Sequence, residues 1–98
     1  MKIKISKRAR RRAEKLDERW RREADYPNLF AEELNGVLLE LASIPQLGSS
    51  WPTERRPMLK RLLLAKTKYH LYFEIDERKQ VIRILTVWGA TRGRTPNL

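Results

Sequence analysis

The sequence contains no cysteine and only one histidine, His70, among its 98 residues. Without cysteine the chain has no disulfide framework, no thiolate nucleophile and no thiolate metal site, and we expect neither a metal nor another cofactor. No apolar run approaches the roughly 20 residues of a membrane-spanning helix. Residues 1–5 alternate charged and apolar side chains, whereas a signal peptide would carry a continuous apolar segment. We therefore expect a cytoplasmic protein with no membrane partner.

Acidic residues are also scarce relative to bases, so that the chain carries a net charge of +10. Such a charge favours nucleic acid, acidic protein surfaces or anionic lipid as partners. The exception is residues 25–44, which contain four acids and no base between two strongly basic segments. Apolar residues make up 41% of the chain, enough to predict a folded core. The length fits one domain spanning residues 1–98.

The beginning of the chain predicts a strand followed by a long, charged helix. Ile3 and Ile5 alternate with lysines, which predicts a short strand with both isoleucines on its buried face. Ser6 is the predicted N-cap of the helix. From residue 7 to residue 24, apolar residues recur every three or four positions among charged ones, which is typical of a helix with one narrow buried stripe.

A second helix is predicted after a break at Pro27, because proline disfavours helical geometry at the residue before it. It runs from about residue 29 to residue 43, with an apolar face opposite several glutamates. Gly36 lies inside it at a cost of roughly 1 kcal/mol relative to alanine, which predicts close packing against the first helix. The two helices would form an antiparallel αα-hairpin.

The second half of the chain predicts three strands, at about residues 59–65, 69–75 and 81–88. In the middle strand, large apolar residues alternate with polar ones, so that one face lies in the core and the other, which carries His70, points outward. The last of the three is almost entirely apolar apart from Arg83. The order β-α-α-β-β-β predicts an α+β fold, an antiparallel sheet with the helical hairpin packed on one face.

Four short patterns accompany this order of elements: Pro45-x-x-Gly48, Lys60-Arg61-Leu62-Leu63-Leu64, Tyr69-His70-Leu71-Tyr72-Phe73 and Val87-Trp88-Gly89-Ala90-Thr91-Arg92-Gly93. In this order and spacing they resemble the RelE/ParE toxin superfamily, from about Ile3 to Pro96. The sequence most resembles the ParE-like, plasmid-stabilisation branch of that superfamily. No single pattern is a strict motif, and the specificity lies in their combination.

The resemblance implies the toxin of a type II toxin–antitoxin system, which inhibits growth and is neutralised by a small acidic antitoxin. ParE-like members act by binding DNA gyrase, whereas RelE-like members enter the ribosome and cut mRNA. The first mode is the main prediction, and a ribosome-dependent mRNA endonuclease is the alternative. A third alternative, drawn from the charge alone, is a non-toxic basic module that binds RNA.

The endonuclease alternative can be compared with the residues that the RelE branch uses. Arg61 matches one of its basic strand positions, but Leu63 stands where a second lysine is usual. His70 replaces the arginine that follows the strand tyrosine, and no tyrosine occurs after Tyr72. If the chain is a metal-independent ribonuclease, His70 would be the general acid–base, because its pKa range suits that role, with Arg61 as its partner. The resemblance leaves open whether the chain is an enzyme.

Other arginines are predicted to bind the target or the antitoxin. Candidates for binding a target or a phosphate group are Arg61, Arg83, Arg92 and Arg94. The bases of the first helix oppose the helix dipole near its N-terminus, which suggests a binding role toward RNA or an acidic antitoxin; the candidates are Arg8, Arg11, Arg12, Lys15 and Arg19. The three tryptophans are expected to have packing roles instead, at positions 20, 51 and 88.

Overall fold

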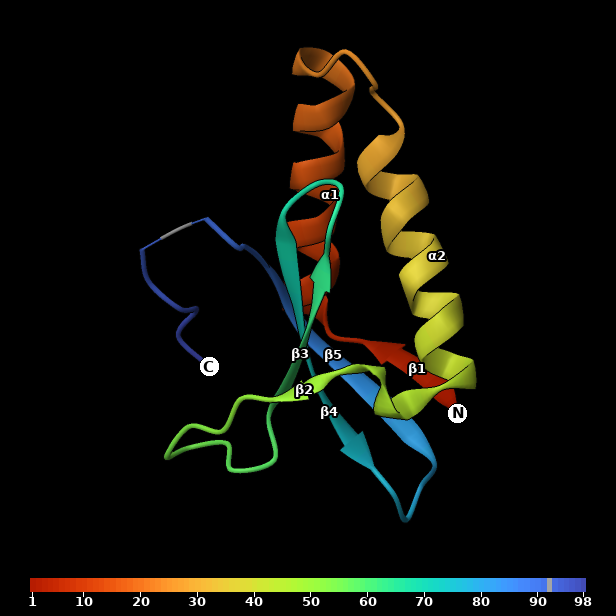
Figure 1. The fold of residues 1–98 in the computed structure, drawn as a ribbon, viewed down its shortest axis with the longest axis vertical. Coiled ribbons are helices and arrows are strands. Elements are labelled where there is room, and N and C mark those ends of the chain that lie inside the picture. Colours follow the sequence, from red (N-terminus) through yellow and green to blue (C-terminus); the bar gives the residue numbers. More distant parts are fainter. Residues whose placement is uncertain (92) are drawn as a thin grey trace.

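The sheet has five strands in the order β1-β5-β4-β3-β2, and two helices stand against one of its faces (Figure 1). The structure is a computed structural model and describes residues 1–91 and 93–98. The elements, in chain order, are β1 (Lys2–Ile5), α1 (Lys7–Glu23), α2 (Leu29–Ser43), the short 3-10 helix η1 (Pro45–Leu47), β2 (Ser49–Ser50), β3 (Lys60–Leu64), β4 (Tyr69–Asp76) and β5 (Val81–Gly89).

The strands β2, β3, β4 and β5 pair with their neighbours in antiparallel fashion, whereas β1 pairs with β5 in parallel. The α+β class and the order of elements are confirmed, and the sheet is mixed rather than purely antiparallel. The helical hairpin separates β1 from the later strands in the sequence, and a long crossing connection of this kind is what parallel pairing requires. The structure also adds the two-residue strand β2 at the sheet edge.

The helices begin and end close to the predicted positions. Ser6 caps α1, because its Oγ accepts a hydrogen bond of 3.0 Å from the backbone N–H of Ala9. The prediction for Gly36 is wrong: this residue is exposed, and apart from its own turn of helix no described atom lies within 4 Å of the position that a Cβ would occupy. Within the described residues, neither helix has the length and apolar character needed to cross a membrane.

The core fills the space between the two helices and the face of the sheet that they cover, which we call the covered face. It is built from aliphatic and aromatic side chains of α1, α2, β3, β4 and β5, namely Ala9, Leu16, Phe30, Leu41, Leu64, Leu71, Phe73, Ile82, Ile84 and Val87. The prediction for β1 holds only in part. Ile3 is half-buried against this core, whereas Ile5 is 39% exposed because β1 is an edge strand.

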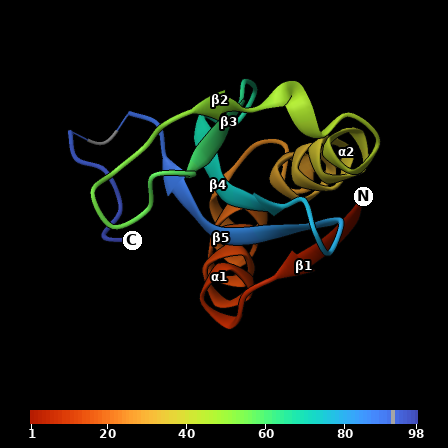
Figure 2. The same cartoon turned by 90° about the horizontal axis from the view of Figure 1, so that it is seen from below.

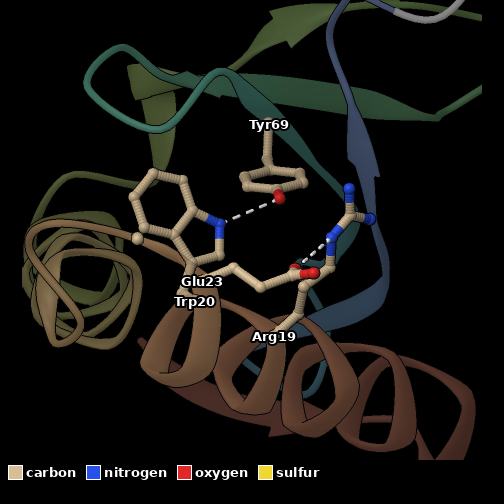
Figure 3. Close-up of a pocket in the computed structure, with 5 residues that line it drawn as sticks. Arg19, Trp20, Glu23 and Tyr69 are labelled. Carbon is tan, nitrogen blue, oxygen red and sulfur yellow. Dashed lines mark hydrogen bonds and ion pairs between the residues drawn. The ribbon is translucent and has the colours of Figure 1, made fainter.

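Side chains of both helices fasten the hairpin to the start of β4. The indole Nε1 of Trp20 in α1 donates a hydrogen bond of 3.0 Å to the hydroxyl of Tyr69, beside the ion pair of Arg19 and Glu23 (Figure 3). The ring of Phe30 in α2 packs edge-on against Tyr69, with the ring centroids 5.2 Å apart. These contacts explain why Trp20 has the packing role expected from the sequence.

Glu33 of α2 binds the turn between β3 and β4. Its carboxylate accepts hydrogen bonds from the backbone N–H groups of Lys66 and Thr67, at 2.7 and 2.9 Å, and from the Thr67 hydroxyl, at 2.7 Å. Burial by itself would raise the pKa of Glu33, but these hydrogen bonds and the charge of Lys66 outweigh it and lower the pKa below its ordinary value. The ionised carboxylate therefore stabilises this turn.

A β-bulge divides β5 into two halves. Phe73 pairs with Ile84 and the preceding Tyr72 pairs with Thr86, so that Leu85 is an extra residue in β5. Because side chains alternate between the faces of a strand, one extra residue exchanges the faces of all later residues. Before the bulge Ile84 points into the core. After it, Val87 does so and Trp88 points to the opposite face.

Candidate functional site

The face of the sheet opposite the helices, which we call the open face, brings Arg61 and His70 together. Arg61 of β3 pairs with Tyr72 of β4, and Leu63 pairs with His70, so that these four side chains lie on the same face. Trp88 of β5 pairs with His70 from the other side. The sequence alone does not tell whether Arg61 and His70 share a face, and the register of β3 against β4 shows that they do.

Two neighbouring hollows lie on the open face, and both are lined by Arg61 and His70. The larger, of about 420 Å³, lies between the sheet and the C-terminal segment, residues 93–98; its other lining residues are Tyr72, Trp88, Gly89, Ala90, Gly93, Arg94 and Thr95. The smaller, of about 340 Å³, lies toward the sheet edge and is otherwise lined by Ser49, Ser50, Trp51 and Leu63. No carboxylate is among these lining residues, so the hollows are suited to an anionic or aromatic group.

The chain between β2 and β3 and the C-terminal segment lie side by side, away from α2, in both views of the fold (Figures 1 and 2). Each of them contributes a wall to one of the two hollows. Neither segment is a regular helix or strand along its length. The strands therefore supply the floor of the site, whereas irregular segments supply its walls, as is common for binding sites.

Two aromatic residues hold the guanidinium of Arg61 in place. Its Cζ lies 3.4 Å from the centroid of the Trp51 ring, a close cation–π contact. Its Nη1 lies 3.4 Å from the hydroxyl of Tyr72. Arg61 therefore presents its charge to both hollows from a restrained position, and this preorganisation lowers the entropic cost of binding an anion.

His70 is half-buried beside Arg61, and its ring lies edge-on to that of Tyr72 with centroids 6.0 Å apart. Burial lowers the pKa of His70 below its ordinary value of 6.5, and the positive charge of Arg61 lowers it further, because both disfavour the imidazolium form. His70 is therefore mostly neutral near pH 7. A neutral imidazole can accept a proton or a hydrogen bond, as a general base must.

Three residues of the site were not predicted as members of it. Trp51 and Trp88 were expected to pack elsewhere, but both line hollows on the open face. Tyr72 was expected on an outward polar face, yet it is only 1% exposed. The alternation of β4 does place Tyr72 beside His70, so part of this signal was in the sequence. Trp88 was hidden by the bulge, which reverses the side to which it points.

The predicted target-binding arginines have different positions. Arg94 lines the larger hollow. Arg83 lies on the same face by alternation, but it lines neither hollow, and its Nη1 is 3.5 Å from the Asp76 carboxylate near the β4–β5 turn. Arg92 lies outside the described residues. The structure thus brings Arg61 and Arg94 together with His70 and leaves Arg83 apart.

Three of the five candidate bases of α1 make contacts within the chain. Arg8 donates to the backbone carbonyl of Asn97 at 2.8 Å, and Arg12 donates from Nε to the carbonyl of Val87 at 3.1 Å. Arg19 pairs with Glu23 at 3.2 Å, on an exposed part of the helix. The other two, Arg11 and Lys15, are exposed. Among the described residues, no group of three histidine, aspartate or glutamate side chains could hold a metal ion.

Residues 3–93 match the model of a protein family described as the ParE toxin of the type II toxin–antitoxin system ParDE. The fold resembles the RelBE2 toxin–antitoxin complex of Mycobacterium tuberculosis, at a TM-score of 0.67 and 20% identity over 90% of this chain and 95% of that one. It also resembles the chromosomal ParDE system of P. aeruginosa, at a TM-score of 0.64 and 16% identity over 91% of this chain and 95% of that one. The isolated E. coli RelE toxin is similar at a TM-score of 0.60 and 20% identity, over 94% of this chain and 86% of that one.

No curated protein sequence matches the chain. At 16 to 20% identity these solved structures support the fold alone, whereas the family model extends over nearly the whole sequence and includes the four patterns on which the resemblance was based. The chain belongs to the ParE toxin family of type II toxin–antitoxin systems.

Proposed function

We propose that this toxin inhibits growth by binding an essential cytoplasmic target through the open face of its sheet. The observation that supports this proposal is the convergence of Arg61, His70 and Arg94 with three aromatic rings around two hollows whose described lining residues include no carboxylate. Interfaces concentrate their binding energy in aromatic and arginine side chains that sit in restrained, partly desolvated positions. Arg61, held between Trp51 and Tyr72, has this character.

The target that fits the family best is DNA gyrase. Purified toxin is expected to inhibit supercoiling by gyrase, and induced expression is expected to stop growth. Arg61→Gln should abolish most of both effects, because it removes the charge shared by the two hollows. Arg78→Gln is the matched control, since Arg78 is exposed in the β4–β5 turn and lines neither hollow. Normal supercoiling in the presence of active toxin would exclude gyrase as the target. An equal loss of inhibition in both variants would exclude the open face as the surface that binds the target.

An antitoxin is the second partner that we infer. Several solved proteins of similar fold are toxin–antitoxin complexes, RelBE2 and ParDE among them. With a net charge of +10 this toxin attracts an acidic partner, and charge complementarity speeds such encounters. The exposed bases Arg11 and Lys15 are the ones we expect it to contact. Because a surface charge acts mainly on the association rate, Arg11→Gln with Lys15→Gln should slow binding more than it speeds release.

A metal-independent endoribonuclease is the second candidate, and the state of His70 is the observation that favours it. A histidine with a lowered pKa beside a fixed guanidinium resembles a general base next to a phosphate-binding group. Leu63, where the RelE branch usually has a lysine, argues against it. Mapping mRNA 5′ ends after induction tests this candidate. Cuts that are phased with codons and disappear in His70→Ala would support cleavage by the toxin, and a pattern of ends unchanged by induction would contradict it.

A further inference from the structure

The first turns of α1 contact the opposite end of the chain. Beyond Ile5, where β1 stops, Ser6 and the first turns of α1 continue along the edge of β5 and donate hydrogen bonds to its backbone carbonyls. The backbone N–H of Ser6 donates to the carbonyl of Ile84 at 3.1 Å, and the Ser6 hydroxyl donates to that of Leu85 at 3.2 Å. One turn and a half later, Nε of Arg12 donates to the carbonyl of Val87 at 3.1 Å.

Arg12 also reaches past this edge to the open face. Its guanidinium carbon lies 4.8 Å from the centroid of the Trp88 ring, so that the charge lies over the indole. Hydrogen bonding of Nε to the Val87 carbonyl fixes the plane of the same guanidinium. One side chain of α1 therefore positions an indole that lines the larger hollow.

Trp88 in turn holds the C-terminal segment, residues 93–98. Its Nε1 donates to the carbonyl of Arg94 at 2.9 Å, and Gly93, Arg94 and Thr95 line the larger hollow. Farther along, Arg8 donates to the carbonyl of Asn97 at 2.8 Å. The segment has no helix or strand of its own, and a chain end without such contacts would be mobile. Its position therefore depends on Trp88 and on α1.

We propose that Arg8 and Arg12 are positioning residues of the open-face site: they clamp Trp88 and residues 93–98 so that these form one wall of the larger hollow. The functional part of this inference rests on the proposed role of the open face, whereas the clamp itself does not. Arg12 contributes through its planar guanidinium, which a lysine cannot reproduce, and Arg8 secures the far end of the segment.

The test follows the indole N–H groups by NMR in the purified protein. Arg12→Gln is expected to accelerate hydrogen exchange of the Trp88 indole about tenfold, because its ring and acceptor are no longer held. Arg12→Lys should behave like Arg12→Gln, and Arg8→Gln should accelerate backbone exchange in residues 93–98. Arg10→Gln is the matched control, since it removes the same charge from an exposed position on the same helix.

Trp20 provides an internal reference for folding, because its indole is bonded to Tyr69 at the other end of α1 and should be unchanged in every variant. Unaltered exchange of Trp88 in Arg12→Gln would overturn the clamp, and so would equal acceleration in Arg10→Gln. Growth inhibition separates the two proposals. If exchange accelerates and growth inhibition is undiminished, the clamp is supported but the open face is contradicted as the target-binding surface. If growth inhibition weakens in Arg8→Gln and Arg12→Gln but not in the control, both the clamp and the role of the open face are supported.

Discussion

The two faces of the sheet are built from the same strands in different ways. On β4, Leu71 and Phe73 point to the covered face, where they are fully buried under the helices. The residues that alternate with them, His70 and Tyr72, point to the open face and are enclosed by irregular segments and other polar or aromatic side chains. The covered face is thus held by the nonspecific burial of apolar area, whereas the open face depends on individual contacts. The first should resist small changes of sequence, and the second should not.

The largest expected effect is the loss of a core side chain from the covered face. Phe73→Ala should lower the free energy of unfolding by about 3–5 kcal/mol, because it removes a fully buried ring. Leu63→Ala on the open face, where the leucine is 45% exposed, should cost only about 0.5 kcal/mol. Chemical denaturation of both variants measures the difference. Equal losses would mean that the open face is as important to stability as the core.

Removing the charge of Glu33 tests how far the β3–β4 turn depends on the helices. At pH 7, Glu33→Gln should lower the free energy of unfolding by about 1–2 kcal/mol, because three hydrogen bonds to an ionised carboxylate are weakened. Because folding lowers the pKa of Glu33, its contribution is complete above the ordinary value of 4.5 and is lost as the pH falls through the lower folded-state value. The two stability curves should therefore converge in acid, and a difference independent of pH would refute this account.

Gly36→Ala should strengthen the helices that cover the sheet without touching either face. The position is exposed, its surroundings are open, and alanine loses less conformational entropy in a helix than glycine. We expect the free energy of unfolding to rise by about 0.5–1 kcal/mol. Thermal and chemical denaturation would show this gain, while growth inhibition should stay unchanged. A loss of stability would reveal packing at Gly36 that the structure does not contain.

The smallest effect concerns the electrostatics of the open face. Arg61→Gln should raise the pKa of His70, because it removes the nearby positive charge, but burial should keep it below the ordinary value of 6.5. His70 is the only histidine, so its titration by NMR needs no assignment by mutation. Arg83→Gln is the control, since Arg83 pairs with Asp76 away from the hollows. A pKa that rises equally in the control would point to net charge instead of the neighbouring guanidinium.

The sequence predicts the covered face well because periodic patterns report burial. Ser6 and Pro27 marked the ends of the helices, and the apolar stripe of β4 marked the side that faces them. The parallel pairing of β1 and the exposure of Ile5 were missed, because a four-residue strand carries no signal of its neighbour's direction. Hydrophobic periodicity reports the burial of one helix or strand, whereas strand pairing depends on two strands at once.

The open face was harder to predict because it depends on register and on irregular segments. Arg61 and His70 share a face only because the turn at residues 65–68 pairs Leu64 with Tyr69. In that turn Lys68 has a φ of 66°, a conformation that is rare for a residue with a side chain. The turn type is therefore difficult to predict from the sequence. The C-terminal wall depends on Arg8 and on Trp88, which lie far apart in the sequence, and no local pattern links them.

The bulge at Leu85 has a consequence for how β5 tolerates variation. Up to Ile84 the even-numbered positions point into the core, whereas from Val87 onward the odd-numbered ones do. A saturation scan along the strand should therefore show a period-two profile whose phase slips by one residue at the bulge. Selection for a new target could then act on Trp88, which lines the larger hollow, without repacking the core. Deleting Leu85 would remove the slip and exchange the two sets of side chains.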